Sequence, residues 1–472
     1  MCMLFLLSIK ISSAQFHHQH KNKKIADSTT NNYIIIQHIT LEGNRRTRDE
    51  IIFRELTFLP GDTIAVDQLM KQLEVSRNQV VNTGLFNEVV VNIKKWVNDS
   101  VDVSVSVKER WYILPLPTAN LYDRSFNVWW VEHDHDIRWI QAGIHFNQKN
   151  VTGRNDELQA TVLFGFQRRF DITYILPYFD YIQKHGLSVS ASFTQSRSIT
   201  YAIDSNKELI HEDVNTYQRS VFQTSLDFSY KPKFNYRYSA SLGYRYSKVQ
   251  DTIAELNPDY FLQGKTTQKY LSLRIGFTRD FRDIRAYPLR GSFLDVSAAK
   301  LGLGFLSDLD LWEASVSFNE YFQLGRKWFM SSQNKMKFSI PTAQPYNLQR
   351  GLGYANNYVT GYEYYAIDGQ NWGYTKLDLK NEIFKIKLHS LQNNVFVKGA
   401  DLPFGLYGRV FTSAGYVSNA HSSTHNTLDN HLLLGGGIGV DLTLLYDTTL
   451  RFEYSINKLG EHGLFFHLSS YF

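Results

Sequence analysis

Most of the chain alternates between apolar and polar residues with period two. From Thr118 to the C-terminus such segments recur many times, with clear examples at 187–194, 234–247, 271–278 and 450–456. Successive side chains of a β-strand point to opposite faces, so the pattern predicts a long series of strands with one apolar and one polar face. At about 20 to 24 residues for a strand and its connections, the stretch has room for about sixteen strands.

Residues 33–110 follow a different pattern, with apolar runs at strand spacing and at helical spacing. Thr47 and Glu50 have the spacing of a capping box at the start of the first helix. The pattern predicts a small α+β domain with the order β-α-α-β-β. Its apolar positions are Ile34 and Ile36; Ile51, Ile52 and Leu56; Leu69, Leu73 and Val80; Val89, Val91 and Ile93; and Val101, Val103, Val105 and Val107.

The composition favours a membrane barrel over a soluble β-sandwich. Aromatic residues make up 15% of the chain, with 29 Tyr and 32 Phe against 10 Pro, as expected for strands with aromatic girdles. After the N-terminus no apolar run approaches the roughly 18 residues that a spanning helix requires. A sandwich would also alternate, but no second sheet of comparable apolarity is left to pack against. The predicted fold is mainly β: a transmembrane antiparallel β-barrel of residues 111–472, preceded by the small domain.

The N-terminus has the features of a secretory leader. Residues 1–14 form a signal peptide, with Ser12 and Ala14 before the expected cleavage site, and residues 15–32 form a polar linker. Cleavage would remove Cys2, the sole cysteine, so no disulfide is expected in the mature chain.

The last strand ends on an aromatic residue. Its apolar face carries Leu464, Phe466, Leu468 and Phe472. Because an edge cannot stay unpaired in lipid, we expect this strand to pair with the first barrel strand, near Trp139–Phe146, and to close the ring.

No pattern indicates enzymatic chemistry. The cluster 132–136 has residues suited to a metal ion, but it lies in an expected loop, where a hydrated tip is the simpler interpretation. The glycines of 435–439 lack dinucleotide-binding spacing, and we expect them to permit either close packing against an inserted loop or a kink of the strand. We therefore expect no catalytic residue, no cofactor and no metal site. A net charge of +5 gives no reason to expect nucleic-acid binding.

Several short motifs resemble one family. Residues 39–110 resemble a POTRA domain. The matching residues are Glu42-Gly43-Asn44 with Thr47, Arg54-Glu55-Leu56, Gly61-Asp62, Asn82-Thr83-Gly84-Leu85-Phe86 and Glu109-Arg110-Trp111-Tyr112. The barrel is similar to that of the outer-membrane assembly and two-partner secretion superfamily, which is BamA/TamA-like and includes the bacterial surface antigen barrels. Its matching segments are Asn150 to Gly153, Leu176 to Phe179, and the barrel-wall motif Asp280, Arg282 and Asp283.

The resemblance implies a long loop that folds back into the lumen. The superfamily has Val-Arg-Gly-Tyr there, whereas this chain has Val359-Thr360-Gly361-Tyr362. Without the arginine, the loop cannot form the usual bidentate ion pair with acidic groups of the wall. Arg350 is a candidate substitute.

The resemblance also implies a function. It places the barrel in the bacterial outer membrane, in contact with lipid and lipopolysaccharide, and the small domain in the periplasm. Unfolded outer-membrane or secreted clients would add to an exposed POTRA edge at Val89, Val91 and Ile93 and then be inserted or passed on. Accessory periplasmic proteins are further candidate partners. A two-partner-type secretion pore and a passive porin-like barrel remain alternatives.

Overall fold

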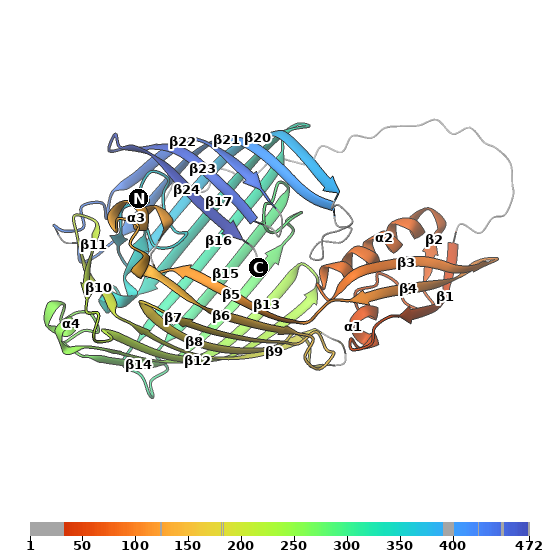
Figure 1. Ribbon diagram of the computed structural model, residues 1–472, viewed down its shortest axis with the longest axis horizontal. Coiled ribbons are helices and arrows are strands. Elements are labelled where there is room, and N and C mark those ends of the chain that lie inside the picture. The colour runs from red at the N-terminus through yellow and green to blue at the C-terminus, as the bar shows by residue number, and fades with distance from the viewer. Residues whose placement is uncertain are drawn as a thin grey trace.

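The computed structural model describes residues 33–122, 125–180, 182, 184–389, 401–422, 424–444 and 448–470. The expected signal peptide, the linker and Phe472 lie outside them. Two parts follow one another along the chain: a small N-terminal domain, and a large antiparallel sheet that curves around a lumen (Figure 1). The end of the barrel that lies beside the N-terminal domain is called the near end, and the opposite end of the barrel is called the far end.

The N-terminal domain has one short strand more than the sequence predicts. Its sheet has the order β2-β1-β4-β3, in which β1 and β4 are parallel and the other pairs antiparallel. The missed strand, β2, has three residues, too few to show a period of two. The elements are β1 (Tyr33–Glu42), α1 (Asp49–Phe53), β2 (Thr63–Ala65), α2 (Val66–Asn82), β3 (Phe86–Val97) and β4 (Ser100–Glu109).

The expected capping box is wrong. Helix α1 is preceded by Arg48, which makes no side-chain cap. The hydroxyl of Thr47 instead donates to the carboxylate of Glu109 at 2.7 Å. The Thr47 hydroxyl therefore bonds to a residue that is distant in the sequence instead of capping the helix.

The large sheet contains sixteen strands, which confirms the expected number. All neighbouring pairs are antiparallel. In chain order they are β5 (Ile113–Leu121), β6 (Ile140–Lys149), β7 (Glu157–Phe164), β8 (Gln167–Leu176), β9 (His185–Ser196), β12 (Arg219–Lys233), β13 (Tyr236–Val249), β14 (Thr267–Asp280), β15 (Gly291–Leu301), β16 (Leu311–Gln323), β17 (Trp328–Ile340), β20 (Asn371–His389), β21 (Asp401–Ser418), β22 (Leu432–Thr443), β23 (Thr448–Asn457) and β24 (His462–Ser470).

Smaller elements lie in the connections. At the far end, Figure 1 shows the hairpin of β10 (Ser198–Asp204) and β11 (Lys207–Glu212) near helices α3 (Phe126–Glu132) and α4 (Asp251–Leu256). The connection between β17 and β20 contains η2 (Tyr346–Leu348), β18 (Arg350–Leu352) and β19 (Ile367–Asp368), and η1 (Ile137–Trp139) precedes β6. Within the described residues, each helix is too short or too polar to cross a membrane.

The alternation of the strands separates an outer apolar face from the lumen. On adjacent strands, Leu242, Leu273 and Ile275 are exposed on the outside, whereas Ser247 and Gln268 are buried. The outer face presents apolar side chains to its surroundings, as a lipid-facing belt requires.

The expected first barrel strand is wrong by one strand. The sheet begins with β5, and the segment near Trp139–Phe146 is largely its neighbour β6. Pro115 and Pro117 conceal β5 in the sequence, because proline is uncommon inside a sheet and is tolerated where the N–H would have no partner.

The expected closure of the ring is also wrong. Strands β5 and β24 are the two edge strands of the sheet, and no pairing joins them among the described residues. Helix α3, which follows β5, instead contacts β24 through Asn127. The boundary between β5 and β24 is called the seam.

Candidate functional site

The near end holds the N-terminal domain in a network of contacts. Asn150 donates to the hydroxyl of Thr47 at 2.8 Å, and Arg48 N–H donates to the carbonyl of Gly153 at 3.0 Å. The guanidinium of Arg54 lies 3.2 Å from the ring centre of Tyr178. The motifs that resembled the family separately in the sequence thus meet at one junction.

Glu109 organises this junction. Its carboxylate accepts from the backbone N–H of Arg46 and from the backbone and hydroxyl of Thr47, at 2.7 to 3.2 Å. Burial by itself would raise the pKa of Glu109, but these hydrogen bonds outweigh burial and lower it. The group therefore stabilises the junction when it is ionised.

We expect the junction to weaken in acid. A lowered folded-state pKa contributes stability that is fully present above the unfolded value, about 4.3, and that is lost as the pH falls through the folded value. Limited proteolysis of the junction between pH 3 and pH 7 measures this. Glu109→Gln should remove most of the dependence, and Glu42→Gln, at an exposed pair with Lys94, should leave it. Identical pH profiles for wild type and Glu109→Gln would contradict the assignment.

The loop between β17 and β20 is buried by other parts of the barrel. Its residues Leu352, Val359, Tyr362 and Ile367 form an apolar cluster with Trp372, Val417, Leu428 and Leu433 of the strands and of the far-end connection 419–431. Glycines make this possible. A Cβ on Gly435 would lie 1.8 Å from the carbonyl oxygen of Thr360, and one on Gly415 would lie 2.3 Å from Val359. The expectation that the glycines of 435–439 permit close packing is confirmed at Gly435.

The Val359–Tyr362 motif is held by hydrogen bonds. Thr360 N–H donates to the hydroxyl of Ser413 at 3.0 Å, and the Asn457 side chain donates to the carbonyl of Gly361 at 2.8 Å. Gly361 has a φ of +84°, which favours glycine. Backbone polar contacts and packing therefore hold the motif, without an arginine.

The barrel wall supplies the missing cation. Arg409 of β21 lies 2.6 Å from Asp378 of β20, 3.1 Å from Glu453 of β23 and 3.8 Å from Asp441 of β22. Arg451 adds a second ion pair with Asp441 at 2.9 Å. The candidate substitute, Arg350, lies elsewhere: its guanidinium is over Tyr354 of the same loop, 5.0 Å from the ring centre, and it interacts electrostatically with Glu208 of β11 and Asp368 of β19.

The barrel-wall motif acts on this cluster indirectly. Arg282 forms a bidentate pair with Asp280, and Asp283 accepts from the N–H groups of Ile284 and Leu289, which shapes the near-end turn 281–290. The same turn carries Tyr287, whose hydroxyl donates to Asp441 at 2.8 Å. The motif therefore holds the turn that contacts the charge cluster.

A second polar group joins the loop to the seam. Glu363 of the loop, Glu453 of β23 and His467 of β24 have ligand atoms within 4.8 Å of one another, so they could hold a cation. Lys376 interacts electrostatically with both carboxylates, however, and its ammonium lies 3.5 Å from the ring centre of Tyr358. A charge balance of this kind suits an ion-pair network better than a metal centre.

The far end is covered by three connections joined at Asn206. This fully buried residue lies in the turn of the β10–β11 hairpin. Its carbonyl accepts from Ala366 of the loop, and its side chain contacts Asn426, Thr427 and Leu428 of the connection 419–431. These three connections are called the lid.

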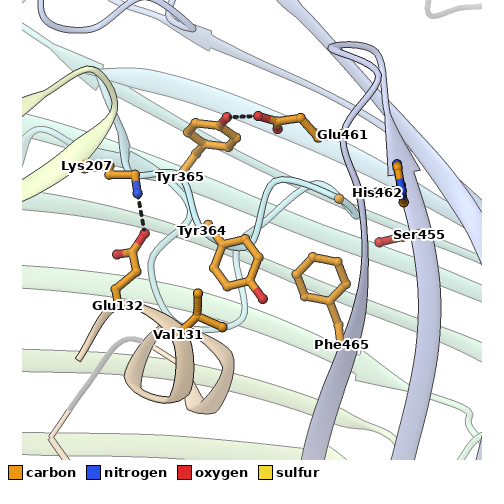
Figure 2. A pocket seen from close by; sticks show the side chains of 10 residues that line it. Val131, Glu132, Lys207, Tyr364, Tyr365, Ser455, Glu461, His462 and Phe465 are labelled. Atoms are coloured by element: carbon orange, nitrogen blue, oxygen red, sulfur yellow. Dashed lines mark hydrogen bonds and ion pairs between the residues drawn. The ribbon is translucent and has the colours of Figure 1, made fainter. Parts of the chain in front are cut away.

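A cavity of about 240 Å³ adjoins the C-terminal end of α3 and is lined by Val131 and Glu132 of the helix (Figure 2). The loop residues Tyr364 and Tyr365 also line it, and Lys207 of the lid pairs with Glu132 of α3 at 3.2 Å. The cavity thus adjoins both the seam and the lid, and the loop and the β10–β11 hairpin are the parts of the lid that line it.

Family models match both parts of the chain. A model described as the Omp85 superfamily domain matches residues 150–459, and a POTRA model described as surface antigen variable number repeat matches residues 34–110. None of the curated proteins compared with the sequence matches it.

Solved structures show the same fold. The chain is similar to BamA from Haemophilus ducreyi lacking POTRA domains 1–3, with a TM-score of 0.58 and 15% identity over 92% of this chain and 84% of that one. CdiB from Escherichia coli gives a TM-score of 0.57 and 13% identity over 92% of this chain and 76% of that one. CdiB from Acinetobacter baumannii gives a TM-score of 0.51 and 14% identity over 93% of this chain and 74% of that one.

The Omp85 model covers well over half of the chain, the POTRA model covers the N-terminal domain, and the solved neighbours share the fold. The protein is therefore an outer-membrane β-barrel with one POTRA domain, and it belongs to the Omp85 superfamily.

Proposed function

We propose that the protein is a non-enzymatic assembly or translocation factor that captures unfolded clients by strand addition to its POTRA domain, in the periplasm. The observation that carries this proposal is the edge position of β3, which pairs with β4 alone among the residues that the structure describes. A strand edge pairs through its backbone, so it accepts clients of many sequences.

The backbone of β3 suits this role at Val91 and Ile93. The Arg77 side chain donates to the carbonyl of Val89 at 3.1 Å, so Val89, Val91 and Ile93 direct their polar backbone groups away from β4, up to the register shift that follows Ile93. The side chains of Val89 and Val91 are buried in the core, and Ile93 packs partly against it. These three residues would therefore bind a client through their peptide groups, and Arg77 must move if pairing is to include Val89.

The barrel would then insert the client or pass it on. Likeness of fold to BamA and to CdiB supports both outcomes, and the CdiB neighbours make a secretion pore the second candidate. The packed lumen loop and the lid favour either role over a passive porin, which needs an open lumen. Surrounding lipid and lipopolysaccharide, and accessory periplasmic proteins, are further proposed partners.

Proline at position 91 tests the strand addition. Val91→Pro removes an outward N–H without breaking the β3–β4 ladder, so client capture should fall to near background while the domain stays folded. Crosslinking in cells from a photoreactive residue at the exposed position Asn92, followed by mass spectrometry, measures capture.

Val90→Ala is the matched control, because it shortens an exposed side chain of the same strand and leaves the backbone intact. Captured nascent barrels would favour insertion, and a single exported protein would favour secretion. Unchanged capture by a folded Val91→Pro protein would refute the proposal, and so would a large steady conductance with no client at all.

A further inference from the structure

The two strands at the seam differ in their capacity to pair. In β5, the carbonyl of Tyr112 accepts from Lys149 and the N–H of Tyr122 donates to Trp139, so even-numbered positions face β6. Odd-numbered positions face the seam, and two of them are Pro115 and Pro117, which have no N–H. The seam edge of β5 is therefore a poor template for another strand.

The seam edge of β24 has the opposite character. Asn457 N–H donates to the carbonyl of Glu461, which places odd-numbered residues of β24 against β23. Leu464, Phe466 and Leu468 therefore direct an N–H and a carbonyl each toward the seam. The side chains of Leu464 and Leu468 are 76% and 63% exposed on the outer face of the barrel.

Asn127 of α3 occupies this edge as a peptide group would. Its side-chain amide donates to the carbonyl of Phe466 at 3.1 Å, and its side-chain oxygen accepts from the N–H of the same residue at 3.0 Å. A neighbouring antiparallel strand makes the same pair of hydrogen bonds. Asn127 is 6% exposed, so the contact is shielded from water.

The attachment of α3 to β24 is local. The ring of Phe126 packs edge-on against Phe466 at 5.4 Å, and the helix starts on a cap by Ser125. On its inner side, Val131 and Glu132 line the cavity shown in Figure 2. The helix also buries Val128, which is 1% exposed, so its attachment includes an apolar contact beside those with Phe466.

We propose that α3 regulates the seam: Asn127 keeps the free edge of β24 occupied until an incoming strand displaces it. The partner is an extended segment with alternating apolar residues, because its apolar side chains would continue the outer face beside Leu464 and Leu468. This inference rests on the proposed function, since it concerns the second step of the same strand addition.

The test uses the full-length protein in lipid vesicles and a synthetic peptide of about ten residues, enough to span a bilayer as a strand, that alternates Leu or Phe with Ser or Thr. Photoreactive residues at Leu468 and, separately, at Asn92 report binding at the two edges. Asn127→Leu keeps the side-chain size without its polar atoms, Asn127→Ala removes both, and Glu255→Ala on the exposed face of α4 is the control.

Both Asn127 variants should raise crosslinking of the peptide at Leu468 about tenfold, because the two hydrogen bonds from Asn127 to Phe466 no longer compete with the peptide. The crosslinking yield at Asn92 should not change. Hydrogen exchange at the Phe466 amide should also accelerate, whereas exchange at Phe465, which faces β23, should not. If neither variant folds, Glu132→Gln, which loosens the contact with Lys207, should give the same change.

Two results would overturn the inference. Crosslinking at Asn92 together with an unchanged yield at Leu468 in folded variants would refute the role of α3 and leave the proposed function intact. No crosslinking at either position, in any variant, would refute the proposed strand addition, and the inference would fall with it.

Discussion

Arg409→Met is expected to destabilise the barrel by about 3 to 5 kcal/mol, because it leaves buried carboxylates without their shared cation. The side chains of Arg409, Asp378, Asp441 and Glu453 are all at most 4% exposed. Met keeps much of the volume of Arg, so a loss of packing contributes little. Denaturant unfolding in lipid vesicles and the temperature at which gel mobility changes would measure the loss.

Two companion variants separate charge from other causes. Arg409→Met combined with Glu453→Gln removes one charge of each sign, so it should recover part of the stability that the single variant loses. Arg138→Met removes an arginine whose pair with Asp136 is exposed, and it should have no measurable effect. Equal stability of the wild type and Arg409→Met would show that the cluster does not replace the missing loop arginine.

Gly435→Ala is expected to displace the Val359–Tyr362 segment from its position against β22. The new Cβ would lie 1.8 Å from the carbonyl oxygen of Thr360, far inside van der Waals contact. Because that oxygen belongs to the backbone, no side-chain rotation can relieve the clash. Displacing the segment also breaks the hydrogen bonds to Ser413 and Asn457. We expect a severalfold rise in planar-bilayer conductance and faster proteolysis of the loop, with the barrel still folded.

Gly408→Ala is the matched control for this prediction. It adds the same methyl group to the neighbouring strand β21, where the nearest atom is 3.6 Å away at the end of the Ile383 side chain. Its conductance should equal that of the wild type. Equal conductance of Gly435→Ala and Gly408→Ala would mean that the loop does not depend on this close approach.

The sequence predicts what depends on local patterns. Alternation indicates which residues form strands, and the length of the alternating stretch gave the number of strands. The glycines of 435–439 were expected to permit close packing or a strand kink, and the structure shows close packing at Gly435. The loop motif 359–362 was found through family resemblance, and the loop does pack against other parts of the barrel.

Contacts that depend on register could not be predicted. Asp378, Arg409, Asp441 and Glu453 come from four strands, and their meeting follows from how those strands slide against one another. Asn127 and Phe466 are 339 residues apart, so no spacing links them. The closure of the ring was expected because a free edge is costly in lipid, but a side-chain amide can satisfy part of an edge as well as a strand can.

The buried residue Asn206 makes the lid cooperative through its backbone carbonyl and its side-chain amide. It serves the hairpin, the lumen loop and the connection 419–431 at once, so moving any one of them leaves the others with an unsatisfied polar group. We therefore expect the far end to open as a unit or not at all. The seam is held differently, by an edge contact that can be exchanged one hydrogen bond at a time. A polypeptide in this barrel would thus meet an all-or-none barrier along the axis and a graded one at the side.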